Sequence, residues 1–313
     1  MTANYFSEEQ VDVWRAEGAV LLPSFFTPDE IAPCLRDMRK IYHDRGPARA
    51  GAHALETERD GAVGTFSLDQ FKNFDDMPFD CSPALNLLGL HPQLIAFAKA
   101  ALGSDAVHLY QSHAWAKFTG EADYEQNFHC DYKNHTLIVP SDEIRLRTIN
   151  FMIYLTDVDD AHGAVHYVPQ SASGSITGPY RPMFLEGDRE TQLALKAAEL
   201  SGAAPAGSIF AYGIDVYHRG TNLTAVGGSR YTLTASYKDA GNDMIGWSAW
   251  PFSFLKPWHL LFDNATPEQL SCIGVPPPGD TFWTSRTLER AKQRWPNWNL
   301  APYREALSSG SLP

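Results

Sequence analysis

Three side chains in this chain of 313 residues could hold a single metal ion: His129, Asp131 and His218. His129 and Asp131 are two residues apart, and alternate side chains of a strand share a face. Both could therefore contact one ion while Cys130 points away. A later histidine, placed after another strand, would complete a set of two histidines and one carboxylate. This set covers one face of an octahedral ion, leaves the remaining positions open and is typical of non-haem Fe(II) oxygenases.

A single His-x-Asp pair is a weak signal, because the chain has 11 histidines and such pairs are often structural. A carboxylate-binding pair strengthens it. Arg230 presents a planar fork of donors that suits a carboxylate, and Thr232 follows two residues later on the same face of a predicted strand. Together they could hold the distal carboxylate of 2-oxoglutarate, whereas Arg230 taken alone would be assigned to the solvated surface.

Composition excludes several classes of function. The net charge is -12, from 37 acidic and 25 basic residues, and no cluster of Lys or Arg stands out, which argues against a sequence-independent grip on nucleic acid. The same charge argues mildly against a highly anionic substrate. No signal peptide and no apolar run long enough for a membrane span are visible. Four scattered cysteines form no CxxC pair, so we expect reduced thiols in a cytoplasmic protein.

The order of predicted elements indicates a single domain over residues 1–313, mainly β with surrounding helices. We expect a helical part over about 1–104, a strand-rich core over about 105–240 and a C-terminal extension over about 241–313. In the core, short β-branched and aromatic runs alternate with turn residues, which suggests a sandwich or a barrel. The clearest of these runs are 149–155, 164–168, 208–212 and 231–237.

The helical part contains two irregular segments. Thr27 and Pro28 form a helix start, and Pro33 then predicts a kink or a restart, because it lies past the first turn. Residues 45–80 show little periodicity and predict a long excursion, either a lid or a surface loop.

Four segments carry a resemblance to a known family. They are residues 127–131 (NFHCD), 154–169 (from YLTDVD to VP), 205–208 (PAGS) and the segment that holds His218, Gly220, Asn222 and Arg230. In these segments and in their order the chain resembles the phytanoyl-CoA dioxygenase family of 2-oxoglutarate oxygenases. The resemblance extends over roughly residues 8 to 240.

The resemblance implies a fold and a ligand set. Members of that family have a double-stranded β-helix (a cupin-like jelly roll), with helices packed outside and the metal at its open end. Carried over position by position, it implies that His129, Asp131 and His218 bind Fe(II). It also implies that Arg230 binds the C5 carboxylate of 2-oxoglutarate.

Two further residues correspond to polar positions that line the co-substrate pocket in such proteins. They are Gln111 and Lys117, on the strand before the His-x-Asp segment. The alternatives are a packed polar residue for Gln111 and a solvated strand edge for Lys117.

The chain departs from the family pattern at two places. Residues 169–172 read PQSA where the family has PGSH, which affects a turn near the site and no ligand. Arg219 replaces a small residue after the distal histidine, and we expect it to form an ion pair at the rim rather than guide an anionic substrate. Asp131 is intact, whereas halogenating relatives have a small residue there, so the resemblance implies hydroxylation or a related oxidation.

The expected function is therefore that of an Fe(II)- and 2-oxoglutarate-dependent dioxygenase. It would use O2 to hydroxylate an unactivated C–H bond of a small organic substrate, with succinate and CO2 as co-products. One alternative is a fatty acyl-CoA 2-hydroxylase, which the acidic charge and the lack of a basic cluster disfavour. The other is a jelly-roll protein that binds a metal without redox activity.

Four residues are candidate substrate contacts because they lie near the core motifs: Trp115, His162, Tyr237 and Trp247. Core packing is the competing interpretation for the aromatic side chains among them. We expect a small-molecule substrate and neither a nucleic acid nor a membrane as a partner.

Overall fold

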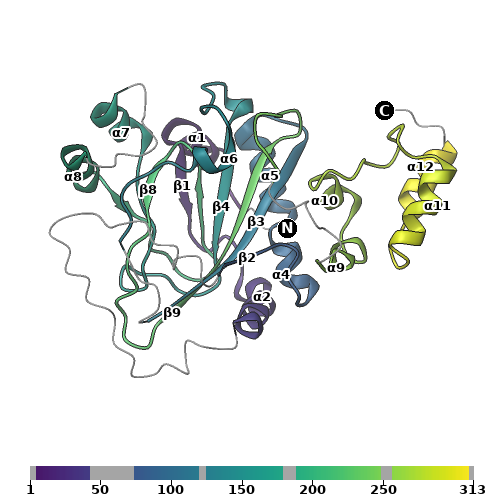
Figure 1. The fold of residues 1–313 in the computed structure, drawn as a ribbon, viewed down its shortest axis with the longest axis horizontal. Coiled ribbons are helices and arrows are strands. Elements are labelled where there is room, and N and C mark those ends of the chain that lie inside the picture. Colours follow the sequence, from purple (N-terminus) through teal and green to yellow (C-terminus); the bar gives the residue numbers. More distant parts are fainter. Residues whose placement is uncertain (1–4, 43–73, 120–124, 179–187, 248–255, 310–313) are drawn as a thin grey trace.

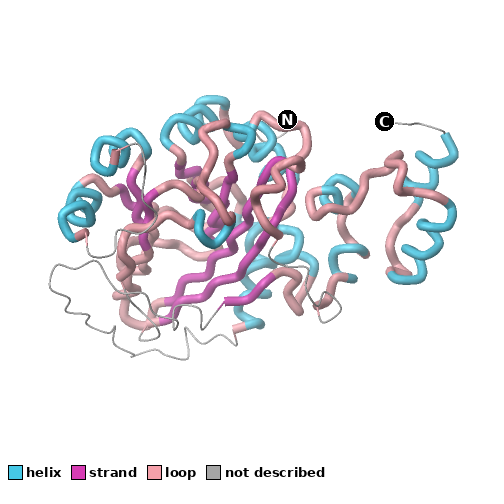
Figure 2. Tube along the Cα trace, turned by 45° about the horizontal axis from the view of Figure 1, so that its top comes forward, coloured by secondary structure: helices cyan, strands magenta, loops and turns pink. Residues whose placement is uncertain are grey.

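The computed structural model describes residues 5–42, 74–119, 125–178, 188–247 and 256–309 (Figure 1). Its centre consists of two antiparallel sheets that face each other as in a jelly roll (Figure 2). The larger sheet has six strands, in the order β1 (Ala19–Leu22), β7 (Ile209–Tyr212), β4 (Thr148–Tyr154), β9 (Ser229–Asp239), β3 (Val107–Phe118) and β2 (Phe74–Asp76). The smaller sheet is β6 (Leu200–Ser201), β5 (His166–Val168) and β8 (Tyr217–Arg219).

The two faces of the larger sheet differ in chemistry, because alternate residues of a strand point to opposite sides. On β9 the outer face is apolar and belongs to the main hydrophobic core: Tyr231, Leu233, Ala235 and Tyr237. The inner face of the same strand is polar, and all of its residues are buried: Arg230, Thr232, Thr234, Ser236 and Lys238. The interior of the barrel is therefore built to contact polar groups rather than to pack as a dry core.

Helices from the N-terminal part pack on the outer face of the larger sheet. They are α1 (Glu8–Glu17), α2 (Pro28–Ile41), α4 (Pro83–Leu88) and α5 (Pro92–Leu102). Phe97 of α5, for example, meets Phe151 of β4 edge-on, with ring centroids 5.7 Å apart. The predicted restart at Pro33 is wrong, because α2 runs without interruption from a capping box at Thr27. The helix tolerates Pro33 through its other hydrogen bonds and its packing.

The excursion predicted over residues 45–80 lies partly outside the described residues. The part that is described contains a strand that the sequence did not predict, because Phe74–Asp76 pairs with β3 as β2. Tertiary pairing overrides the weak local preference of Asp for strands here.

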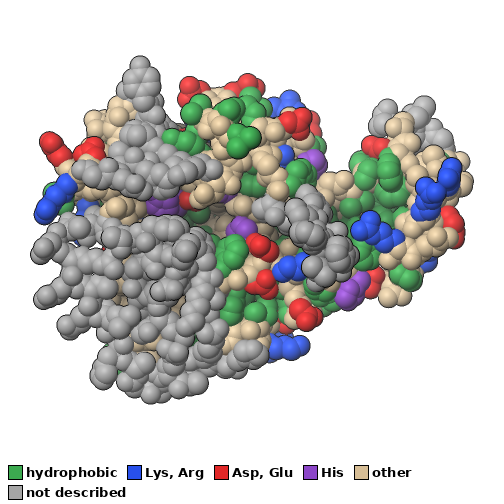
Figure 3. All heavy atoms as spheres, viewed as in Figure 1, with side chains coloured by type: hydrophobic (Ala, Val, Ile, Leu, Met, Phe, Trp, Pro, Cys, Tyr) green, Lys and Arg blue, Asp and Glu red, His purple; other side chains and the backbone are tan. Residues whose placement is uncertain are grey.

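The remaining helices connect the strands or belong to the C-terminal extension. The connecting ones are α6 (Tyr132–His135), the 3-10 helix Ile144–Leu146, α7 (Gln170–Thr177) and α8 (Arg189–Ala197). The extension holds α9 (His259–Phe262), α10 (Pro267–Ser271), α11 (Ser285–Arg294) and α12 (Ala301–Ser309), and α11 and α12 lie at the end of the molecule far from β8 (Figure 1). On the face drawn in Figure 3, Lys and Arg side chains occur in small separate groups. Within the described part of the chain, no helix is long and apolar enough to cross a membrane.

An ion-pair network supports the smaller sheet from its outer face. The guanidinium of Arg219 on β8 donates two hydrogen bonds to Glu199, of 2.7 and 2.9 Å, and another to Glu125. His166, opposite Arg219 on β5, has its Nδ1 3.1 Å from Glu199 and its Nε2 3.1 Å from Asp160. Arg219 is 3% exposed, so it is a structural residue of the sheet and the expected ion pair is present.

The same network shifts the pKa values of His166 and Glu199. Contact with Glu199 raises the pKa of His166 above 6.5 against the effect of burial. Burial of Glu199 would raise its own pKa, but hydrogen bonds from His166 and Arg219 lower it to about 2. Glu199 therefore stays ionised over the whole range in which His166 titrates.

We expect His166→Gln to lower the free energy of unfolding at about pH 6 and to lower it less at about pH 9. A raised folded-state pKa stabilises the protein below the unfolded-state value of 6.5, and that contribution disappears as the pH rises through the folded-state pKa. Urea unfolding of parent and variant at both pH values measures the difference. An equal loss at both would show that the charge of His166 does not support the sheet.

Candidate metal centre

His129, Asp131 and His218 meet on the inner face of the smaller sheet. Their ligand atoms all lie within 4.8 Å of one another. Nε2 of His129 is 3.5 Å from one carboxylate oxygen of Asp131, and Nε2 of His218 is 3.4 Å from the other. The backbones of His129 and His218 exchange two hydrogen bonds of 3.1 Å, so the segment around His129 continues the smaller sheet beside β8. Pairing places the two rings side by side, with centroids 4.6 Å apart.

Backbone carbonyls set which nitrogen of each histidine is free for a metal. Nδ1 of His129 lies 2.9 Å from the carbonyl oxygen of Asn127, and Nδ1 of His218 lies 3.0 Å from that of Val216. In each case Nδ1–H donates to the carbonyl, which leaves the lone pair of Nε2 directed at the other ligands. This arrangement fits a metal ion held by two imidazoles and one carboxylate.

The electrostatics of the three groups also suit a metal. Burial and the positive charge of His218 lower the pKa of His129. Burial raises the pKa of Asp131, but the charges of His218 and His129 outweigh it, so the pKa of Asp131 is lowered. A divalent ion needs neutral imidazole and ionised carboxylate, and the lowered pKa values of His129 and Asp131 favour these forms at those two residues.

Tyr212 supports the carboxylate and was not predicted as a site residue. It is the last residue of β7, its hydroxyl donates a hydrogen bond to Asp131, and its ring lies 4.9 Å from that of His218. The only signal in the sequence is the alternation of the strand 208–212, which places Phe210 and Tyr212 on one face.

Arg230 and Lys117 lie opposite each other on β9 and β3, at one end of the barrel interior. Arg230 donates a hydrogen bond to the carbonyl of Gly163, and Nζ of Lys117 donates to the carbonyl of Thr221 at 2.9 Å. Gly163 has φ 71°, and a Cβ there would lie 2.7 Å from the Thr221 oxygen. Glycine thus lets two loops approach closely and present carbonyls to both cations.

Thr232, two residues after Arg230 on β9, is a buried polar group close to this end. It lies between Trp115 of β3 and Tyr154 of β4 in the sheet and is 1% exposed. Its hydroxyl oxygen has no hydrogen-bond partner among the described residues. A buried hydroxyl without a partner costs free energy, so a ligand that accepts its hydrogen bond is the simplest explanation. The predicted grouping of Arg230, Thr232 and Lys117 remains a proposal, which this geometry supports.

Gln111 lies farther along β3, six residues before Lys117, which is about 20 Å along a strand. Its amide donates to the hydroxyl of Ser236 at 3.2 Å and lies 3.5 Å from the ring nitrogens of His135. Gln111 therefore cannot share a carboxylate with Lys117. Its role in the co-substrate pocket stays a prediction, and it would apply to the end of the pocket near the metal.

The four candidate substrate contacts occupy different environments. Tyr237 faces the outer core and donates to the carbonyl of Gly89 at 2.6 Å, so packing explains it. His162 lies in a surface turn beside Asp159, and Trp247 packs against His108 and Lys238. Trp115 alone lies on the inner face of the larger sheet, opposite Thr232.

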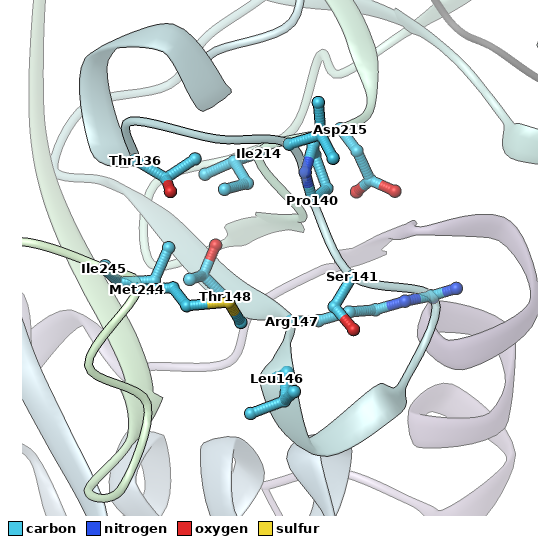
Figure 4. Close-up of a pocket in the computed structure, with 11 residues that line it drawn as sticks. Thr136, Pro140, Ser141, Leu146, Arg147, Thr148, Ile214, Asp215, Met244 and Ile245 are labelled. Atoms are coloured by element: carbon cyan, nitrogen blue, oxygen red, sulfur yellow. The ribbon is translucent and has the colours of Figure 1, made fainter.

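Two cavities elsewhere do not include the metal ligands. The one drawn in Figure 4, lined by residues such as Thr136, Ile214 and Ile245, has a volume of about 10 Å³, enough for about one water molecule. A larger cavity of about 510 Å³ lies against the C-terminal extension, between Trp258 and Trp295. Neither one competes with the triad as a reaction site.

We expect Tyr212→Phe to weaken binding of a divalent ion by about tenfold or more, because the hydrogen bond that orients Asp131 is lost. Titration with Co(II), followed by its visible absorption, measures the affinity. Tyr154→Phe is the matched control, since its hydroxyl donates to the carbonyl of Gly202 and not to a ligand. Equal affinities of the parent and Tyr212→Phe would contradict the supporting role.

Comparisons with known proteins identify the family of this chain. Residues 14–230 match the profile of phytanoyl-CoA dioxygenase (PhyH). Ectoine dioxygenase from Bordetella parapertussis is 27% identical over 171 residues, which are 54% of this chain and 50% of that protein. The enzyme of the same name from Bordetella bronchiseptica matches to the same extent. The chain thus aligns with about half the length of the curated relatives it matches.

Solved structures show the same fold at low sequence identity. EctD from S. alaskensis, in its apoform, superposes with a TM-score of 0.54 at 17% identity, over 82% of this chain and 84% of that one. SnoK, a non-heme alpha ketoglutarate dependent carbocyclase from nogalamycin biosynthesis, superposes with a TM-score of 0.53 at 19% identity, over 77% of this chain and 87% of that one. The predicted jelly roll is confirmed, and so is the predicted resemblance. With its profile match over more than half its length, the chain belongs to the phytanoyl-CoA dioxygenase family.

Proposed function

We propose that this protein is an Fe(II)- and 2-oxoglutarate-dependent dioxygenase that hydroxylates an unactivated C–H bond of a small organic substrate. Succinate and CO2 would be the co-products, and O2 the second co-substrate. The observation that carries the proposal is one barrel interior that holds both a metal triad with an intact carboxylate and a buried arginine–threonine pair. The relatives that are named as dioxygenases support it.

His129, Asp131 and His218 would hold the iron. Iron with 2-oxoglutarate and O2 would supply the oxidising chemistry, and the protein would supply position and the exclusion of water. The two Nδ1–H groups and the hydroxyl of Tyr212 hold the three ligands in place before the metal arrives. These three residues would bind the ion and leave its other positions to small ligands.

Arg230 would hold the far carboxylate of 2-oxoglutarate. It donates to a neutral carbonyl of Gly163, and a carboxylate forms a stronger, charge-assisted hydrogen bond with the same fork. Lys117 opposite adds a second positive charge, and Thr232 adds a buried hydroxyl. Two cations and a hydroxyl at one end of the interior match a dicarboxylate whose other end chelates the metal.

The interior disfavours the acyl-CoA alternative. On β3 and β9 the cations that face inward are Lys117, Arg230 and Lys238. Lys238 donates to the carbonyls of Asn242 and Ile245, and the other two belong to the proposed co-substrate site. These two strands therefore leave no group of cations for the phosphates of coenzyme A. Assays with acyl-CoA thioesters and with free acids as substrates would distinguish a fatty acyl-CoA hydroxylase from a hydroxylase of another small organic molecule.

We expect the protein to convert 2-oxoglutarate to succinate in the presence of Fe(II), O2 and ascorbate, even without a substrate. Asp131→Ala should abolish this turnover, because the iron loses its anionic ligand. Succinate release measures it, and Asp12→Ala, which removes an exposed carboxylate on α1, is the control. Turnover by Asp131→Ala at the parent's rate would show that the triad is not the reaction centre. Iron bound without any affinity for 2-oxoglutarate would favour the redox-inactive alternative.

Arg230→Gln should raise the KM for 2-oxoglutarate by about tenfold or more, since a charge-assisted bidentate contact is lost. Bound iron should not change. Arg145→Gln removes an arginine that pairs with Asp239 at 2.8 Å outside this site, so it should leave that KM as in the parent. The same KM in Arg230→Gln and in the parent would place the co-substrate elsewhere.

A further inference from the structure

A second polar group lies on the inner face, at the edge of the larger sheet. Nδ1 of His113 on β3 is 2.5 Å from the carboxylate of Asp76 on β2, which lies opposite it in the sheet. The next pair on the same face of these strands is Phe74 and Trp115, with ring centroids 4.7 Å apart. None of these four residues belongs to the triad or to the proposed co-substrate end.

This group lies on the same face of β3 as Lys117, nearer to the start of the strand. His113 lies opposite Thr234, two positions from the Trp115–Thr232 pair and four from the Lys117–Arg230 pair. His135, the last residue of the helix that follows Asp131, lies 3.5 Å from the amide nitrogen of Gln111, and Gln111 is two residues before His113 on the same face of β3. His135 itself is fixed by the hydroxyl of Tyr110, 2.6 Å from its Nδ1. A molecule that touches His113 would therefore lie near the metal.

The chemistry of the group is that of a hydrogen-bond acceptor beside aromatic faces. Nδ1–H of His113 donates to Asp76, so Nε2 is left as an acceptor, and the side chain of Asp76 is 45% exposed. The nearby cation, Lys256, is occupied by the carboxylate of Asp75 at 3.0 Å and the carbonyl of Asp76 at 2.8 Å. Aromatic faces attract C–H groups and cations, and acceptors bind hydroxyl or ammonium donors.

We propose that Asp76, His113, Phe74 and Trp115 form a substrate subsite for a ring that bears hydroxyl or amino groups, of the amino-sugar kind. The inference rests on the proposed function, because the subsite serves the same metal. Trp115 takes the face of the ring, Phe74 packs between Trp115 and His113 with ring centroids 4.7 and 4.5 Å away, and the His113–Asp76 pair accepts hydrogen bonds from the substituents of the ring. Contact at this edge would orient the ring and so determine which C–H bond faces the iron.

Glucose, glucosamine and glucuronate are suitable probes, because they share one ring and differ in a hydroxyl, an ammonium or a carboxylate. Saturation-transfer NMR with the protein in the absence of added metal measures their binding. Succinate release with Fe(II) and 2-oxoglutarate measures their effect on turnover. We expect glucosamine and glucose to bind and to stimulate turnover, and glucuronate to be at least about tenfold weaker, because its charge meets Asp76.

Asp76→Asn should remove the preference for glucosamine over glucose, and His113→Gln should weaken both by about tenfold. Asp75→Asn is the matched control: it makes the same change of charge on the same strand, but its side chain faces Lys256 instead of the barrel. It should keep the parent's pattern. If Asp76→Asn lowers the unfolding temperature, the ratio of glucosamine binding to glucose binding still tests the subsite. A loss of folded protein lowers the binding of both sugars equally.

Two results would overturn the subsite: the parent binds glucuronate as well as or better than the other two probes, or binds none of them. An unchanged glucosamine-to-glucose ratio in Asp76→Asn would do the same. Turnover of 2-oxoglutarate without this discrimination would reject the subsite and keep the proposed function. Discrimination by NMR without any turnover would reject the proposed function and keep the subsite.

Discussion

The whole site depends on one pair of backbone hydrogen bonds. His129 and His218 lie far apart in the sequence, and the two 3.1 Å bonds between their main chains fix them as neighbours in the smaller sheet. Strand geometry then sends both rings inward and sends Cys130 and Arg219 outward. The outer-face ion pairs of Arg219 hold the same strands from behind. The position of the metal is thus determined by the backbone, and the side chains only complete it.

Alternation along β9 gives this strand an apolar outer face and a polar inner face. The outer residues pack against α5 and its neighbours, which provides the hydrophobic free energy of folding. The inner residues from Arg230 to Lys238 contribute little to that term and instead offer donors and acceptors to ligands. Stability and recognition therefore use opposite faces of one strand, and neither has to be sacrificed for the other.

Much of this could be predicted from the sequence, because the relevant signals are local. The His-x-Asp spacing predicts a shared face, Thr27 and Pro28 predict a helix start, and the family motifs predict the jelly roll. Tyr212 could not be singled out, since its importance comes from a partner in a distant segment.

Asp76 could not be predicted as a site residue either. Its strand has three residues, two of them aspartates, and strand preference alone assigns such a segment to a loop. Pairing with β3 creates the strand, and pairing between distant segments is not visible in a single sequence. Gln111 and Lys117 both lie on β3, but six residues separate them, so they reach different parts of the interior.

β2 lies at the free edge of the larger sheet, and within the described part of the chain it pairs with β3 alone. A strand in this position can change its residues without disturbing a second neighbour. β8, which carries His218, and β9, which carries Arg230, have neighbours on both sides and have no such freedom. Mutation of the three residues of β2 could thus change which substrate enters the barrel without any change to the residues proposed to bind iron. The edge of the sheet is where a scaffold of this kind can diversify at the lowest structural cost.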